Sequence, residues 1–256
     1  MPVTVSDSQT ASRFPDAEWQ ARIDLAACYR LADLFGFSDI IWNHITAKVP
    51  GTAHFLINRF GLRYDEVTAS NLVTLDLDGN VVNPGSEQSD EDINLTGYII
   101  HSAIHRARSD VGCVMHSHAE AGLAVSVLKD GLVPMILDAM VFHDRVSYHA
   151  FEGQSDDIDD CERLATSLGD NFVMILRNHG LLTCGDTAGA AFMRMYYLER
   201  ACKVQLQVMA TAQAFDLPAG EVCERAAAQL SRFPSGQFEW PALLRLVETR
   251  FPDFRE

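Results

Sequence analysis

The stretch Val111-Gly-Cys-Val-Met-His-Ser-His118 is an apolar run that ends in a His-x-His pair. A second run, Phe172-Val-Met-Ile-Leu-Arg-Asn-His-Gly180, carries another histidine just past its apolar part. Short apolar runs bounded by polar and glycine residues predict buried strands. Two such strands can bring distant imidazoles to one point, and we therefore place these runs at the centre of the predicted fold.

The three histidines in these runs predict a metal site. Side chains alternate along a strand, so His116 and His118 point to the same side while Ser117 points away. Together with His179 they form a three-histidine set that holds a divalent ion and leaves coordination positions open. The alternative is three ordinary hydrogen-bonded histidines at strand ends, but the Arg177-Asn-His-Gly180 motif favours the metal.

Composition indicates a folded protein that binds neither nucleic acids nor anionic membranes. The chain has 256 residues, of which 48% are hydrophobic, and this suffices for a full core in one large domain. The formal net charge of -15 at pH 7 opposes binding to nucleic acids or anionic membranes, which need a basic surface. We therefore expect neither a nucleic-acid partner nor a membrane partner.

Cysteine use and the first residues indicate a cytoplasmic protein. The 6 cysteines are scattered and include no Cys-x-x-Cys pair, as is typical of free thiols in a reducing compartment. Residues 1–14 contain no apolar segment of the kind found in signal peptides. No stretch reaches the ~18 consecutive apolar residues of a membrane span.

Hydrophobic periodicity and turn residues predict the order of the elements. Helical spacing predicts helices over 16–35, 98–107, 122–127, 156–168 and 187–215, and one or two more within 218–256. Strands are predicted within 40–49, 55–58, 72–77, 81–82, 111–118 and 172–176, with strand-like runs at 133–137 and from 141 onward. This order predicts a central, mainly antiparallel sheet flanked by helices.

The same patterns divide the chain into three parts. Residues 1–15 are expected to form a flexible N-terminal arm, 16–217 the main domain and 218–256 a C-terminal helical extension. The acidic stretch from Ser86 to Asp92 is expected to be a solvated loop.

Three ordered motifs give the chain a family resemblance. They are Asn43-His-Ile-Thr-Ala-Lys-Val49, the helical segment Ile100 to Asp110 that leads to His116-Ser-His118, and Arg177-Asn-His-Gly-Leu-Leu-Thr-Cys-Gly185. Together they resemble the class II aldolase and adducin head domain superfamily over roughly residues 18–215.

The resemblance implies an α/β fold, an α/β/α sandwich around a mainly antiparallel sheet of about nine strands. It also implies a homotetramer with active sites at subunit interfaces and a small-molecule substrate. In the family's enzymes the three histidines hold Zn or another divalent ion, with Mn and Fe as alternatives, and the ion makes carbon–carbon cleavage possible.

The chain departs from the family pattern in the substrate site, which suggests an adducin-like branch. The Ser-Ser-Glu motif of sugar-phosphate aldolases corresponds to Leu95, Thr96 and Gly97, so the catalytic glutamate is absent. The phosphate-binding stretches correspond to Trp42-Asn43, Phe60-Gly61 and Leu95-Thr96, where bulky apolar residues replace small donors. The predicted substrate-binding set is thus Asn43, Phe60, Gly61, Thr96 and Gly97, and a non-phosphorylated carbonyl compound fits it better than a sugar phosphate.

Loss of the glutamate leaves the proton carrier open. Metal-bound hydroxide is one candidate, because a divalent ion can lower the pKa of bound water to about 7. The side chains considered are Glu199, Tyr148 and His143, with His149 next to them. Two of them also have a structural interpretation: Glu199 as an ion-pair residue beside Arg200, and His143 as a surface histidine.

Three further histidines are interpreted as secondary polar groups near the cleft. They are His44, His101 and His105, and the last two lie one helical turn apart and can simply pack or cap their helix.

Three functions of different class remain open at this point. The first is a metal-dependent lyase that cleaves or decarboxylates a small hydroxy or keto carbonyl compound. The second is a non-haem iron or manganese oxygenase acting on a keto acid, because three imidazoles with open positions also suit those metals. The third is a non-catalytic, adducin-like binding domain.

Overall fold

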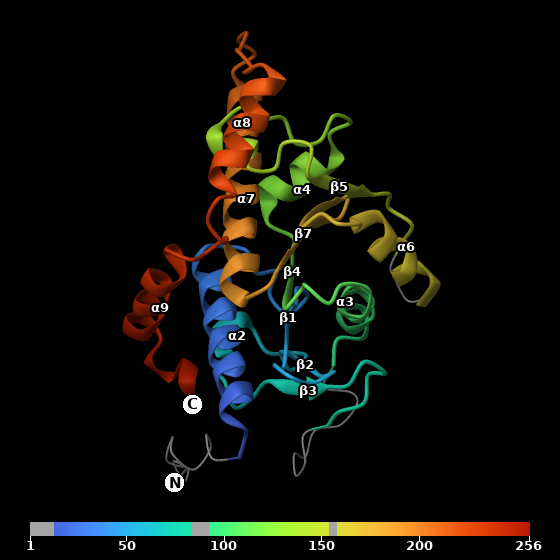
Figure 1. The fold of residues 1–256 in the computed structure, drawn as a ribbon, viewed down its shortest axis with the longest axis vertical. Coiled ribbons are helices and arrows are strands. Elements are labelled where there is room, and N and C mark those ends of the chain that lie inside the picture. The colour runs from blue at the N-terminus through green and yellow to red at the C-terminus, as the bar shows by residue number, and fades with distance from the viewer. Residues whose placement is uncertain (1–12, 83–92, 154–157) are drawn as a thin grey trace.

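The computed structural model describes residues 13–82, 93–153 and 158–256. The predicted arm lies almost entirely outside these residues, and so does the acidic stretch from Ser86 to Asp92. The element order is helix, three strands, helix, strand, two helices, strand, helix, two strands and three helices (Figure 1).

One sheet runs through the middle of the molecule. Its strands are β1 (Ile45–Lys48), β2 (Phe55–Ile57), β3 (Val73–Leu75), β4 (Cys113–Ser117), β5 (Val146–His149), β6 (Val173–Leu176) and β7 (Gly180–Gly185), in the spatial order β3-β2-β1-β4-β7-β6-β5. Neighbours pair antiparallel except β5 and β6, which are parallel. The two predicted histidine-bearing runs form β4 and β6, and β7, a strand that the sequence pattern did not predict, lies between them.

The expectation of about nine strands is wrong, because the described residues form a mixed sheet of 7 strands. The run 133–137 forms no strand; it leads into the short helix α5 (Leu137–Met140), and Pro134 in its middle lacks an N–H for a ladder bond. The predicted strand 81–82 is reduced to a single bridge between Leu75 and Val81.

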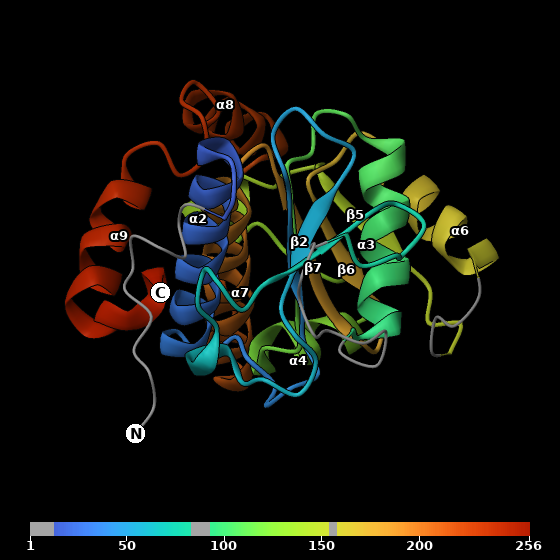
Figure 2. The ribbon, with the colours of Figure 1, turned by 90° about the horizontal axis from the view of Figure 1, so that it is seen from below.

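Helices cover both faces of the sheet (Figures 1 and 2). The helices α2 (Asp16–Leu34) and α7 (Ala188–Ala210) lie on one face, with α9 (Glu239–Arg250) outside them; α3 (Leu95–Ala107) and α6 (Ile158–Leu168) lie on the other. The remaining elements are α4 (Glu120–Val127), α8 (Gly220–Leu230), and the 3-10 turns η1 (Tyr64–Glu66) and η3 (Pro252–Arg255). Among the described helices, none has the length and apolar character needed to cross a membrane.

The long helix α7 is shorter than its sequence pattern predicts. It ends at Ala210, five residues before Phe215, and Ala212 takes a left-handed φ of 52°. A left-handed residue cannot continue a right-handed helix, so the chain turns away there.

Burial of β4 on both sides explains its unbroken apolar sequence. All five of its residues are buried. Cys113 and Met115 belong to the core shared with α2 and α7, whereas Val114 belongs to the core shared with α3. Alternation therefore places His116, two residues after Val114, on the α3 side of the sheet.

A buried arginine connects α2 to the loop before β3. Arg22 is 0% exposed, and its guanidinium donates to the carbonyls of Ala69 and Leu72 and to Oγ1 of Thr74, and pairs with Glu18 at 3.0 Å. Burial lowers the pKa of Arg22, but the Glu18 carboxylate opposes this shift.

We expect Arg22→Met to lower the free energy of unfolding by about 3 kcal/mol, because it leaves Glu18 and two buried carbonyls without their donor. Arg63→Met is the matched control, since Arg63 pairs with Asp65 at an exposed site and its loss should cost much less. Urea unfolding at one protein concentration measures both. Equal losses in the two variants would contradict the structural role of Arg22.

Candidate metal centre

The three predicted metal ligands lie together at one end of the sheet. His116 is in β4, His118 follows that strand, and His179 is in the turn between β6 and β7. One ligand atom from each lies within 4.8 Å of the others. Asn178 (φ 59°) and Gly180 (φ 149°) shape that turn. A Cβ on Gly180 would lie 2.5 Å from the Ser117 carbonyl oxygen, so only glycine lets the turn approach β4 this closely.

Hydrogen bonds fix the protons on two of the ligands. Nδ1 of His116 lies 2.9 Å from the Leu181 carbonyl oxygen, and Nδ1 of His118 lies 2.9 Å from a carboxylate oxygen of Asp39. Both partners only accept, so each Nδ1 carries the proton and each Nε2 has a free lone pair. The two Nε2 atoms are 2.9 Å apart. Two lone pairs this close repel each other unless a cation lies between them, and this donor set fits a divalent metal ion.

Burial keeps two of the predicted ligands, His116 and His179, in the neutral form that binds metal. It lowers the pKa of His116 well below its usual value, with the nearby imidazoles His44 and His179 adding to the effect. Burial, and then the effect of His118, lower the pKa of His179 to about 4. Protonation of these two residues therefore does not oppose metal binding near neutral pH.

Asp39 is the residue of this centre that sequence reasoning missed. Its carboxylate accepts a hydrogen bond from Nδ1 of His118 and so orients that ring, as metal-bound imidazoles require. An aspartate in the loop before β1 carries no signal of its own in a single sequence, because loop aspartates are common.

A layer of buried polar groups lies between β1 and α3, beside the metal centre. It contains His44, Thr46, His101 and His105, all at most 4% exposed. The rings of His44 and His116 are 5.2 Å apart. Burial lowers the pKa of His44 and of His105 to about 3, and that of His101 well below its usual value. All three are neutral at physiological pH.

The predicted substrate-binding residues lie near this centre to different degrees. Asn43 accepts a hydrogen bond from the backbone N–H of His118 at 3.3 Å, and its Nδ2 is buried with no partner among the described residues. The ring of Phe60 lies 5.8 Å from that of Trp42, and Gly61 has a φ of 89°. A Cβ on Gly97 would lie 2.6 Å from the ring of His44. For Thr96, in the first turn of α3, only the backbone is described.

The three candidate proton carriers make other contacts. Both carboxylate oxygens of Glu199 accept backbone N–H bonds from the start of α4, at Ala121 and Gly122, while burial raises its pKa. Tyr148 accepts from the N–H of Leu132, and its ring lies under the Arg177 guanidinium. None of the candidates, including His143, belongs to the three-histidine group found in the described residues.

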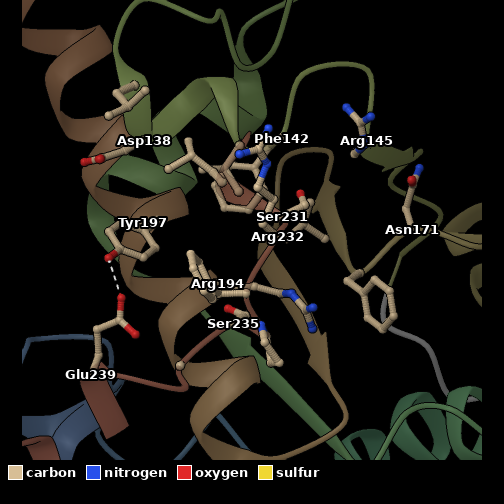
Figure 3. A pocket seen from close by; sticks show the side chains of 18 of the residues that line it. Asp138, Phe142, Arg145, Asn171, Arg194, Tyr197, Ser231, Arg232, Ser235 and Glu239 are labelled. Atoms are coloured by element: carbon tan, nitrogen blue, oxygen red, sulfur yellow. Dashed lines mark hydrogen bonds between the residues drawn. The ribbon is translucent and has the colours of Figure 1, made fainter. Parts of the chain in front are cut away.

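A cavity of about 900 Å³ lies elsewhere, against α5, α7 and the α8–α9 connection (Figure 3). Its lining includes Arg194, Tyr197 and Phe233 but none of the three clustered imidazoles. Tyr197 donates a hydrogen bond to Glu239 there. We place the candidate chemistry at the histidines, because donor geometry and not cavity size decides where an ion binds.

We expect the protein purified without chelator to carry about one divalent ion per chain, as a three-histidine site holds. Gly180→Ala should lose most of it, because the added Cβ pushes His179 away from β4. Gly153→Ala is the matched control: Gly153 also has a positive φ, 107°, but nothing lies within 4 Å of its Cβ position. Elemental analysis measures the ion, and equal metal content in the two variants would exclude the proposed geometry.

The buried imidazoles should also make the metal-free fold sensitive to acid. The unfolded chain binds protons at histidine near pH 6.5, whereas the folded chain binds them at His105 only near pKa 3. Stability should therefore fall as pH drops from about 6.5 toward 3, by about 1.4 kcal/mol per pH unit for each such group.

His105→Gln should reduce this slope of unfolding free energy against pH by about one group's share. His54→Gln, outside the buried layer, is the control. Chemical unfolding at several pH values, with metal removed by chelation, measures both slopes. An unchanged slope in His105→Gln would show that His105 is already charged in the folded state.

Comparison with known proteins gives the family. The model of the Class II Aldolase and Adducin N-terminal domain matches residues 23–206. The crystal structure of an aldolase II superfamily protein from Pseudomonas syringae is similar, with a TM-score of 0.89, 44% identity and coverage of 96% of this chain and 98% of that one.

Two further relatives represent the two halves of the family name. The structure of L-fuculose 1-phosphate aldolase from Glaciozyma antarctica PI12 has a TM-score of 0.83 and 29% identity, covering 97% of this chain and 99% of that one. Alpha-adducin of Mus musculus is 36% identical over 284 residues, which cover 100% of this chain and 38% of that protein. The resemblance read from the three motifs is thus confirmed, and the chain belongs to the class II aldolase and adducin family.

Proposed function

We propose that the protein is a metal-dependent carbon–carbon lyase that acts on a small, non-phosphorylated hydroxy or keto carbonyl compound. The observation that carries the proposal is the pair of free Nε2 lone pairs on His116 and His118, 2.9 Å apart, with His179 beside them. A divalent ion bound by these three residues supplies Lewis-acid polarisation of a carbonyl group. We expect zinc, with manganese or iron as alternatives.

Asn43 is the proposed substrate-binding residue with the strongest support. It is 1% exposed, its Oδ1 faces the backbone of His118, and its Nδ2 lacks a partner within the described part of the chain. A buried amide donor next to the metal ligands is costly unless a ligand satisfies it. A substrate oxygen bound at the metal centre would do so.

The apolar surface beside Asn43 supports a substrate without phosphate. Trp42 is 55% exposed and packs against Phe60. Indole and phenyl groups offer a phosphate dianion neither charge nor hydroxyl donors, whereas they favour a less polar carbonyl compound.

Decarboxylation fits the chain better than aldol cleavage. Gly97 stands where the sugar-phosphate aldolases of the resemblance carry glutamate, and the Glu199 carboxylate is bonded to α4. Aldol cleavage needs a base for the substrate hydroxyl. In decarboxylation the departing CO2 leaves the electron pair of the broken bond on the substrate carbon, so the reaction depends less on a protein base.

We also propose that the enzyme acts as a homotetramer with interfacial sites. Exposed apolar side chains support an assembly: Ile40 is 69% exposed, Trp42 55% and Phe238 63%. Ile40 and Trp42 lie in the loop that also carries Asp39, so a neighbouring subunit there would help to enclose the metal centre.

A second candidate function is adducin-like binding without catalysis. The identity of 36% to alpha-adducin of Mus musculus and the missing glutamate at Gly97 favour it. An iron- or manganese-dependent oxygenase is the third, since the same imidazoles can hold those metals.

We expect the protein reconstituted with zinc to release CO2, or a carbonyl fragment, from at least one member of a panel of small hydroxy and keto acids. Phosphorylated sugars should be poorer substrates. Asn43→Ala should reduce kcat/KM by about tenfold to a hundredfold, the cost of one lost hydrogen bond in a buried site. His54→Ala is the control.

NMR of the reaction mixture identifies the products, and an oxygen electrode runs in parallel. Oxygen uptake by the iron-loaded protein would replace the lyase with the oxygenase. A metal-loaded protein that turns over no member of the panel would favour the adducin-like function.

A further inference from the structure

Four buried groups between β1 and α3 form a continuous hydrogen-bonded chain, which we call the imidazole chain. Nδ1 of His44 lies 3.0 Å from Nε2 of His101, and Nδ1 of His101 lies 2.8 Å from Oγ1 of Thr46. The same hydroxyl lies 2.9 Å from Nε2 of His105. The imidazole chain thus runs from His105, a buried residue of α3, to His44, whose ring lies beside that of the predicted metal ligand His116.

The protons of this chain can be arranged in only two fully bonded ways. Each neutral imidazole has one N–H and one lone pair, and the Thr46 hydroxyl has one proton to donate. Either all three histidines carry the proton on Nδ1, or all three carry it on Nε2. Any other arrangement sets two donors or two acceptors against each other, or leaves the buried hydroxyl proton without an acceptor.

A backbone carbonyl at the far end selects between the two arrangements. Burial and the charge of Lys48 lower the pKa of His105, whereas the backbone of Val111, acting as a hydrogen-bond acceptor for the ring, opposes that shift. Because Nε2 of His105 already faces the Thr46 hydroxyl, we assign this acceptor, the Val111 carbonyl, to Nδ1. Nδ1 of His105 is sealed and makes no full hydrogen bond in the described residues. A carbonyl oxygen attracts a proton on that nitrogen and repels a lone pair, so the Nδ1–H arrangement is favoured.

At the near end, this arrangement leaves Nε2 of His44 as a lone pair. That nitrogen has no hydrogen-bond partner among the described residues, yet it is not one of the fully buried atoms. The 2% of His44 that stays exposed therefore includes it. The ring of His44 lies 5.2 Å from that of His116, and His118 and His179 are close enough to contribute to lowering the pKa of His44, so His44 lies against the candidate metal centre.

The ring of His44 also fills the space next to Gly97. A Cβ on Gly97 would lie 2.6 Å from Cγ and Cδ2 of that ring. The position where the sugar-phosphate aldolases of the family carry glutamate is therefore compatible with His44 only when it is glycine.

We propose that the imidazole chain holds His44 in the neutral Nδ1–H form, so that its Nε2 accepts a hydrogen bond from a hydroxyl group of the substrate in place of the missing glutamate. The acceptor role rests on the proposed function, because it needs a hydroxyl-bearing substrate at the metal centre. The proton arrangement does not, and it can be measured without turnover. Thr46, His101 and His105 are positioning residues.

Nitrogen NMR of the full chain, labelled with ¹⁵N-histidine and reconstituted with zinc, tests the arrangement, because protonated and unprotonated ring nitrogens resonate in separate ranges. His44→Gln, His101→Gln and His105→Gln assign the signals. We expect all three histidines to be protonated on Nδ1 and bare on Nε2. An Nε2–H signal from His44 in the wild type would overturn the proposal.

Variants of Thr46 test the connection between the two ends. Thr46→Val removes the hydroxyl and should shift His44 and His101 from one form to a mixture of both, whereas Thr46→Ser should restore the single form. Ser102→Ala, which removes another buried hydroxyl from α3, is the matched control. If His44 keeps a single form in a folded Thr46→Val variant, the chain does not set it.

The acceptor role is tested with glycolate, a small hydroxy acid. It is added to the zinc protein until the His179 signals stop moving, which reports occupation of the metal centre. We expect the Nε2 signal of His44 to move in step with His179, and that of His105 to stay near its starting position. A stationary His44 signal at that point would overturn the acceptor role even if lyase activity were found, and a moving one would uphold it even if none were found.

Discussion

The structure of the candidate metal centre depends on one electrostatic constraint, the approach of the Nε2 atoms of His116 and His118 to 2.9 Å. His116 and His118 reach this position because they point to the same side of β4, and because the Leu181 carbonyl and the Asp39 carboxylate hold their protons on the opposite nitrogens. Without a cation the arrangement is repulsive. Burial of β4 on both faces stabilises the strand and so holds the two nitrogens in this position.

The sequence predicted the parts of this centre that follow from local periodicity. Alternation along β4 placed two histidines on one side, and the Arg-Asn-His-Gly motif identified the third. Asp39 and the Leu181 carbonyl could not be predicted, because their roles depend on contacts between loops and strands that no local pattern encodes. The estimate of about nine strands came from the family resemblance and not from a local pattern, and the strand-like run 133–137, which contains Pro134, forms no strand in the described structure.

The residues considered as proton carriers show how tertiary contacts change the meaning of a side chain. Glu199 has a suitable chemistry, but its carboxylate satisfies the N–H groups at the start of α4. His44, considered only as a secondary polar group, lies against the metal ligand His116 at the end of a buried polar chain. The presence of glycine at position 97 becomes understandable only when the ring of His44 is seen to occupy the adjacent space.

The central claim, that His116 and His118 bind one ion through their Nε2 atoms together with a ring nitrogen of His179, is tested most directly by anomalous diffraction from crystals of the zinc-reconstituted protein. Data above and below the zinc absorption edge locate the ion independently of any model. The account predicts one anomalous peak about 2.0–2.1 Å from Nε2 of His116 and of His118 and from a ring nitrogen of His179. A peak bound elsewhere on the chain, or one that reaches His116 through Nδ1, would contradict it.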